Sequence, residues 1–310
     1  MKNFIIRTIT GILFVAVMVT GICLRGDAMV LLFALITGLT VWEFCGLVNN
    51  WDGVNHQQNP SSPTSPSSPI TVNRFIATAA GVYLFLAVAG FCTDLVSSAI
   101  FIPYLLTVVY LFISELYLQQ KNPVNDWAYT MLSQMYVALP FSMINVLSFR
   151  SDFQADEVSY QWLLPMSVFI FLWTNDTGAY LSGSLFGKHK LFPRVSPGKT
   201  WEGSIGGAIL VLLVAYGIGS LDNVFIADMD HPRVFGAALM PIWQWLGMGL
   251  VVVFFGTWGD LVESLFKRTL GIKDSGNILP GHGGMLDRFD SSLMAIPASV
   301  IYLYTLEYFG

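Results

Sequence analysis

Residues 28–48 read AMVLLFALITGLTVWEFCGLV, and this stretch decides the class of fold. It carries one charged residue, Glu43, among side chains that are almost all apolar. About 20 apolar residues in an α-helix are enough to cross a hydrocarbon core of about 30 Å. The stretch therefore predicts a transmembrane helix with an acid near one end.

Similar apolar blocks recur along the whole chain. They predict nine membrane spans, near residues 8–24, 28–48, 75–93, 97–118, 127–149, 161–184, 203–220, 241–265 and 291–308. We read the first as a retained span rather than a signal peptide, because ICLRGD is a poor cleavage site and a second span follows at once. We therefore expect an all-α, polytopic integral membrane protein.

The composition argues against the alternative of a large soluble globule. Of the 310 residues, 54% are hydrophobic and 11% are charged, whereas soluble domains carry about 25% charged residues. A soluble protein of this composition would expose large apolar patches. The three cysteines, Cys23, Cys45 and Cys92, lie in or beside apolar spans and form no CxxC pair, so they predict neither a disulfide framework nor a zinc site.

The basic residues predict the orientation, because cytoplasmic loops are enriched in Lys and Arg. With a cytoplasmic N-terminus, 12 of the 15 Lys and Arg residues fall inside and 3 fall outside. The outside set is Arg25, Arg150 and Arg233. This asymmetry is consistent with nine spans.

Two regions are expected on either side of residue 172. Residues 1–172 would hold the N-terminal transmembrane helices and a disordered, Ser/Pro-rich loop at 49–73. Residues 173–310 would form the catalytic transmembrane region, with cytoplasmic loops at 185–203 and 267–290.

Residues 264–290, SLFKRTLGIKDSGNILPGHGGMLDRFD, concentrate the charge that the rest of the chain lacks. Just before them, Asp260 and Glu263 share a helix face with Lys267; a purely structural ion-pair stripe is one interpretation of that face. In the loop, glycines 281, 283 and 284 flank His282, so the backbone can turn tightly and present N–H groups to an anion.

Carboxylates repel a phosphate unless a cation lies between them. Mg²⁺ takes oxygen ligands and is commonly held by one or two carboxylates and substrate phosphates. Two acids at membrane depth, Asp260 and Asp287, could hold it. Lys267, Arg268, Lys273 and Arg288 could neutralise a polyphosphate. The residues predict metal-assisted chemistry on a phosphate-rich substrate at the inner membrane face.

The loop before the seventh span is also basic. Residues 173–203 read WTNDTGAYLSGSLFGKHKLFPRVSPGKTWEG and place Asp176 within an apolar block. An acid at that depth usually has a partner or a function. SPGKT lacks the G-x-x-x-x-G-K-[ST] frame, so a nucleotide-hydrolase P-loop is not supported. The loop could bind phosphate, or it could simply touch anionic lipid head groups.

Residues 264–290 resemble the signature of the phosphatidate cytidylyltransferases, or CDP-diacylglycerol synthases. The chain supplies every fixed position of that pattern: Ser264, Lys267, Arg268, Lys273, Asp274, Gly276, Pro280, His282, Gly283, Gly284, Asp287, Arg288 and Asp290. NDTGAYLSGSLFGKHK, SPGKTWEG and Glu43 in VWEF also resemble companion segments of the family. The resemblance covers about 173–290; the first 170 residues match mainly in hydropathy.

The resemblance implies the reaction of CTP with phosphatidate to give CDP-diacylglycerol and pyrophosphate, using Mg²⁺ and a second cation, monovalent or divalent. It implies that Lys267, Arg268, Lys273, Asp274, His282 and Arg288 are catalytic. We expect His282 to donate a hydrogen bond to a phosphate or to stabilise the turn, rather than to act as the base. It implies substrate binding by Asp176, Ser196, Lys199, Thr200, Gly283 and Gly284, and metal binding by Asp260, Asp287, Asp290 and Glu263. For Asp176, a buried ion-pair role is almost as well supported.

The same resemblance implies a multi-pass protein of the cytoplasmic (inner) membrane, with its active site facing the cytoplasm and no nucleic-acid partner. A homodimer is reasonable on family grounds, although no residue argues for it. Three rivals are a transporter using Glu43, Asp176 and Asp260 as a cation route, a CDP-alcohol phosphotransferase, and a non-catalytic scaffold. DTGAY at 176–180 lacks the arginine of the CDP-alcohol phosphotransferase motif. A non-catalytic scaffold would be expected to lack some of the signature residues, and none is missing.

Overall fold

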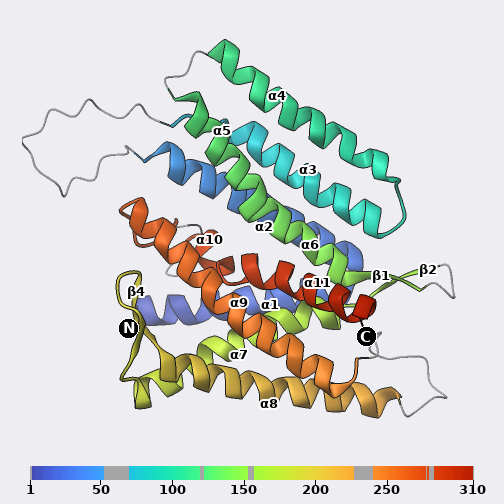
Figure 1. Cartoon of the computed structure of the whole chain (residues 1–310), viewed down its shortest axis with the longest axis vertical. Helices are drawn as coiled ribbons and strands as arrows, with labels where there is room; N and C mark the ends of the chain where they lie inside the picture. Colours follow the sequence, from blue (N-terminus) through green and yellow to red (C-terminus); the bar gives the residue numbers. More distant parts are fainter. Residues whose placement is uncertain are drawn as a thin grey trace, which may run out of the picture. The chain divides into compact units, whose positions relative to one another are not determined.

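The structure is a computed structural model that describes residues 2–51, 70–118, 122–152, 157–226, 240–276, 278 and 283–309. It is built almost entirely of helices (Figure 1). The nine predicted spans correspond to α1 (Lys2–Leu24), α2 (Gly26–Asn49), α3 (Arg74–Cys92), η1 with α4 (Ser98–Phe101, Ile102–Leu118), α5, η2 and α6 (Pro123–Leu132, Ser133–Ala138, Leu139–Ser148), α7 (Leu163–Phe186), α8 (Trp201–Ile226), α9 (Ile242–Thr269), and α10 with α11 (Leu286–Phe289, Ser292–Phe309). The all-α expectation is confirmed.

Eight of these segments are long and apolar enough to cross a membrane by length and composition, counted over the described residues. The remaining predicted span, α7, has 24 residues. Helices suit this environment because all their backbone hydrogen bonds are satisfied within the segment. Their outward faces are apolar, as in α4, where Leu105, Leu106 and Val109 are exposed. The chain is a multi-pass membrane protein.

Two short hairpins were not predicted. β1 (Phe149–Asp152) pairs with β2 (Glu157–Tyr160), and β3 (Lys190–Phe192) pairs with β4 (Ser196–Thr200), both antiparallel. The second hairpin lies in the predicted cytoplasmic loop 185–203. That segment is therefore an ordered connection between α7 and α8, because ladder bonds fix its backbone.

The chain divides into two compact units made of interleaved segments. Unit 1 comprises residues 1–13, 30–142 and 266–288, and unit 2 comprises residues 14–29, 143–265 and 289–310. The predicted functional division at residue 172 is a different kind of boundary and stays a prediction.

Unit 1 has an aromatic core, in which Phe44 stacks on Phe266 with ring centroids 5.0 Å apart. The ends of the predicted Ser/Pro-rich loop are fixed to this unit. Asn49 exchanges two hydrogen bonds of 2.8 Å with the backbone of Val72. Asp126 accepts from the backbone N–H and hydroxyl of Thr71 at 2.8 and 3.0 Å. Residues 52–69 of that loop lie outside the described residues.

Unit 2 is organised by the pair α7 and α8, which run side by side (Figure 1). Glycines line their contact: a Cβ built on Gly178 would come within 2.9 Å of the Cα of Gly207. On α8, Gly203 and Gly207 lie one turn apart, which is the small-xxx-small spacing that lets membrane helices approach closely. The close approach holds β4, at the start of α8, against α7.

Candidate functional site

The segment that links α9 to α10 in unit 1, residues 270–285, is called here the signature loop. The two helices that flank it are joined by an ion pair between Lys267 Nζ of α9 and Asp287 Oδ1 of α10, 2.6 Å apart. The side chains are 12% and 7% exposed. The other oxygen of Asp287 accepts from the backbone N–H groups of Ser275 at 2.8 Å and Gly284 at 2.9 Å. Asp287 therefore closes the loop on itself.

Glu43 of α2 supports the loop from a buried position, with 8% of its surface exposed. Its carboxylate accepts from the hydroxyl of Ser275 at 2.5 Å and from the backbone N–H groups of Met285 at 2.9 Å and Leu286 at 3.1 Å. The two backbone groups belong to the start of α10, where helical N–H groups have no intrahelical partner. Glu43 thus caps α10 and fixes the loop at the same time.

Three glycines of the loop are required by this arrangement. Gly283 has φ +82°, a conformation that side-chain-bearing residues rarely adopt. A Cβ on Gly276 would come within 2.8 Å of Glu43 Oε2, and one on Gly284 would collide with Glu43 and Ser275. The predicted tight backbone of this segment is therefore present at the positions described, whereas His282 and Gly281 lie outside them.

Four other charged residues in or beside the signature loop are exposed to solvent. Arg268, Lys273, Asp274 and Arg288 are all exposed. Arg268 Nη1 donates to the carbonyl of Ile272 at 3.2 Å, which ties one guanidinium to the turn after α9. Three of these four exposed residues are cations, whereas the groups that Glu43 and Asp287 bind are buried or partly buried.

Unit 2 gathers four acids that we call the acidic cluster: Asp176, Asp260, Glu263 and Asp290. The carboxylates of Asp260, Glu263 and Asp176 all act on Asp290 as like charges. Lys199 of β4 offsets this charge, because its Nζ lies 2.6 Å from Asp260 Oδ2. Asp260 also accepts from the Ser264 hydroxyl at 3.1 Å. Like charges held together in this way are typical of cation or functional sites.

The close approach of α9 and α11 brings Asp290 to this cluster. A Cβ on Gly259 would come within 2.8 Å of the Asp290 carbonyl oxygen and 3.1 Å of the Ser291 Cα. Glycine at 259 therefore lets the backbone just before α11 lie directly against α9. Glu263 is fully buried on the same helix.

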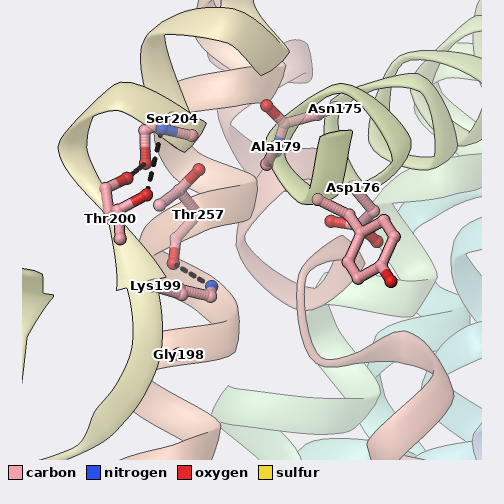
Figure 2. A pocket seen from close by; sticks show the side chains of 10 residues that line it. Asn175, Asp176, Ala179, Gly198, Lys199, Thr200, Ser204 and Thr257 are labelled. Atoms are coloured by element: carbon pink, nitrogen blue, oxygen red, sulfur yellow. Dashed lines mark hydrogen bonds between the residues drawn. The ribbon is translucent and has the colours of Figure 1, made fainter. Parts of the chain in front are cut away.

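A cavity of about 190 Å³ opens beside the cluster (Figure 2). Its lining comes from α7, β4, α8 and α9: Asn175, Asp176, Ala179, Tyr180, Gly198, Lys199, Thr200, Gly203, Ser204 and Thr257. Lys199 Nζ also reaches the Thr257 carbonyl at 3.5 Å, and Thr200 Oγ1 accepts from the Gly203 N–H at 3.1 Å. The cavity thus combines a cation, hydroxyls and an acid, a set that suits a phosphate–metal ligand.

The predicted residues fall into two groups. Unit 2 brings together Asp176, Lys199, Thr200, Asp260, Glu263 and Asp290, and unit 1 brings together Lys267, Gly283, Gly284 and Asp287. Ser196 begins β4, opposite Phe192, and is not in the cavity lining. The assigned roles stay predictions.

Sequence reasoning missed several residues that the structure places in these groups. Ser275, Asn175 and Thr257 have no signal beyond their position next to predicted residues. The Oδ1 atom of Asn175 is buried and accepts no hydrogen bond from the described residues. Glu43 did carry a signal, an acid in an apolar block, but its partners are more than 230 residues away in sequence.

The donor atoms for a metal are carboxylate oxygens. Over the residues that the structure describes, no three His, Cys, Asp or Glu side chains converge closely enough to form a protein-only metal site. Mg²⁺ commonly uses one or two carboxylates and completes its octahedron with water and substrate phosphates. The acidic cluster fits that mode of binding.

Comparisons with known proteins agree with this chemistry. A sequence model of the cytidylyltransferase family matches residues 5–306. Proteins named phosphatidate cytidylyltransferase are similar to the chain in Staphylococcus aureus (41% identity over 178 residues, 57% of this chain and 59% of the relative) and Staphylococcus haemolyticus (42%, with the same coverage). The protein of that name in Haemophilus influenzae is 38% identical over 188 residues, 60% of each chain. The alignments thus span about three fifths of the relatives' length.

Proposed function

We propose, because this chain belongs to the cytidylyltransferase family, that it is a phosphatidate cytidylyltransferase. The observation that carries the proposal is the signature segment 264–290, complete at every fixed position, in a chain whose relatives bear that name. The apolar body of the protein supports a lipid substrate, and the clustered cations support a polyphosphate.

In the proposed reaction, an oxygen of the phosphatidate phosphate attacks the α-phosphorus of CTP. The bond from the α-phosphorus to the bridging oxygen breaks, and pyrophosphate leaves with the electron pair. The attacking oxygen is already anionic near neutral pH, so the reaction needs no strong general base. Catalysis of this kind depends on positioning and on neutralising charge.

The chain's own residues supply the positioning and the positive charge. Lys199 and Lys267 are each held 2.6 Å from an acid, which fixes their ammonium groups in place. The exposed Arg268, Lys273 and Arg288 provide further positive charge for the triphosphate and the leaving pyrophosphate. Thr200 and Ser204 provide hydroxyls in the cavity of unit 2.

We propose Mg²⁺ as the cofactor, with Asp260 and Asp290 of unit 2 as its first candidates and Glu263 as a further one. Asp287, which the sequence ranked beside Asp260, is bonded in unit 1 to Lys267 and to two backbone N–H groups, and we therefore rank it after them. Bound there, Mg²⁺ would polarise phosphate oxygens and offset their charge. The like-charged carboxylates around Asp290 support this assignment, because a cation relieves their mutual repulsion. The proposal also includes a second cation, monovalent or divalent, and a homodimer.

The proposed location is the cytoplasmic membrane of a bacterium, with the site facing the cytoplasm. The 12-to-3 division of Lys and Arg residues supports this orientation. CTP is an aqueous substrate of the cytoplasm, and phosphatidate reaches the protein through the bilayer.

The test uses the full-length protein purified in detergent, with labelled CTP, phosphatidate and Mg²⁺. We expect labelled CDP-diacylglycerol, its loss with EDTA, and its loss in Asp290→Asn and Asp287→Asn. Asp94→Asn is the matched control, because Asp94 is exposed in the turn after α3 and Asn tolerates its φ of 53°.

Absence of product from folded wild-type protein would overturn the proposal and favour the transporter reading. Product that survives Asp290→Asn would keep the reaction and remove Asp290 from the metal site. Product that survives EDTA would remove the metal from the proposal.

A further inference from the structure

One face of α8 is apolar and exposed. Trp201, Ile205, Ile209 and Leu213 follow one another at intervals of four residues and are each 55–64% exposed. Residues at this spacing lie above one another on a helix. They form a continuous ridge, here called the α8 ridge, that begins at the first residue of a helix long and apolar enough to span the membrane.

A basic pocket lies at the head of the α8 ridge. It has a volume of about 760 Å³ and is lined by Lys188, His189, Lys190, Trp201, Glu202 and Ile205. Its two lysines are exposed, and its floor includes the first two members of the ridge. An aromatic side chain at the first residue of a span marks the membrane–water interface, so the lysines lie at the level of the lipid head groups.

The backbone that carries these lysines is fixed. Glu202 of α8 accepts from the backbone N–H of Lys188 at 3.1 Å and of His189 at 3.2 Å, and its Oε1 lies 2.6 Å from His189 Nδ1. The Trp201 N–H donates to the His189 carbonyl at 2.9 Å. The one acid of the pocket is thus engaged by three groups of the loop, while the two ammonium groups face outward.

We propose that the basic pocket and the α8 ridge together bind an anionic phospholipid of the surrounding bilayer. Its phosphate lies between Lys188 and Lys190, and one acyl chain follows Ile205, Ile209 and Leu213. This surface is distinct from the proposed catalytic residues, and the inference does not rest on the proposed reaction.

Charge selects a lipid over a second copy of the chain as the occupant. A two-fold symmetric contact pairs the same patch from both copies. Two α8 ridges packed in this way would bring four lysines to one level of the membrane, and like charges there repel. An anionic head group instead supplies the opposite charge to the lysines and an apolar tail to the ridge, and each lysine near a membrane surface contributes about fivefold in affinity.

The test measures lipid binding by the full-length protein in detergent. Native mass spectrometry would follow titration with phosphatidylglycerol and, separately, with phosphatidylcholine. We expect preferential retention of phosphatidylglycerol, and a loss of affinity of about tenfold to thirtyfold in Lys188→Gln/Lys190→Gln. Ile209→Asn should weaken both lipids by interrupting the ridge.

Arg194→Gln is the matched control, because Arg194 is an exposed cation of the same connection that does not line the pocket. Its phosphatidylglycerol affinity should match that of the wild type. Equal binding of both lipids by wild type, or unchanged phosphatidylglycerol binding by the double variant, would overturn the proposal. So would a loss of dimer mass, rather than of bound lipid, in Ile209→Asn, since a second copy would then cover the ridge.

Discussion

Replacing Glu43 with alanine removes the acceptor of three hydrogen bonds at once. The hydroxyl of Ser275 and the N–H groups of Met285 and Leu286 all donate to this carboxylate. All four residues are buried, so the donors have no direct access to water. A buried donor left without a partner costs about 1–3 kcal/mol. Three such donors destabilise the closed signature loop by about 3 kcal/mol at the lower limit.

Hydrogen exchange with mass spectrometry measures this loss locally. If the loop opens more easily by about 3 kcal/mol, amides at Met285 and Leu286 should exchange roughly a hundredfold faster, since about 1.4 kcal/mol corresponds to a factor of ten. Glu43→Gln keeps one acceptor oxygen but turns an amide NH₂ toward a donor, so its effect should be intermediate, about tenfold.

Glu115→Gln provides the matched control, an acid-to-amide change in another membrane helix of unit 1. Glu115 Oε2 is buried and accepts no hydrogen bond from the residues that the structure describes. We expect this variant to leave exchange at 285 and 286 unchanged. An increase below threefold in Glu43→Ala, or an equal increase in Glu115→Gln, would refute the reasoning that Glu43 holds the loop.

Three further predictions concern other contacts. Gly284→Ala should inactivate the protein and speed loop exchange, because its Cβ would collide with Glu43 and Ser275. Gly217→Ala, in open space on α8, should retain activity, and a CTP-incorporation assay checks both variants. In a double-mutant cycle, Lys267→Met and Asp287→Asn should each lower the stability of the protein by about 3 kcal/mol, measured by thermal unfolding. The double variant should lose less stability than the sum of the two single variants and should remain inactive. Additive losses would contradict the pairing. Gly207→Leu should separate α7 from α8 and lower the stability of the protein by about 2 kcal/mol or more, because even a Cβ would come within 2.5 Å of Asn175 Oδ1. Gly217→Leu, in open space on the same helix, is the control and should change the stability little.

Eight of the nine predicted spans are helices long and apolar enough to cross a membrane, counted over the described residues, and they were predictable because hydrophobic length alone defines such a helix. An apolar block such as 28–48 can be recognised as a membrane helix without knowing which helices pack against it, because the bilayer supplies the apolar environment. The β3–β4 hairpin was not predictable in this way. Its residues, including SPGKT at 196–200, have little strand propensity, and their order depends on Glu202 and on ladder bonds to Lys190–Phe192.

The site was predictable as a set of residues but not as a set of contacts. The sequence predicted that Asp260 and Lys267 share one helix face, where they could have formed a structural row of ion pairs. The structure gives each a partner from another segment, Lys199 for Asp260 and Asp287 for Lys267. Such pairs depend on helix packing between residues 20 or more positions apart, and no local spacing encodes that packing.

The concentration of charge in residues 264–290 has two separate physical reasons. Some of these residues stabilise the loop: Asp287 is bonded to Lys267 and to two backbone N–H groups, and its position therefore follows from folding. Others, such as Arg268, Lys273 and Arg288, are exposed and contribute little to stability, because exposed charges are well solvated. Stability therefore does not explain these three exposed cations, and phosphate binding is the role that we propose for them. Neutralising them singly should spare folding and weaken CTP binding, whereas neutralising Asp287 should disturb both, and that difference separates the two reasons.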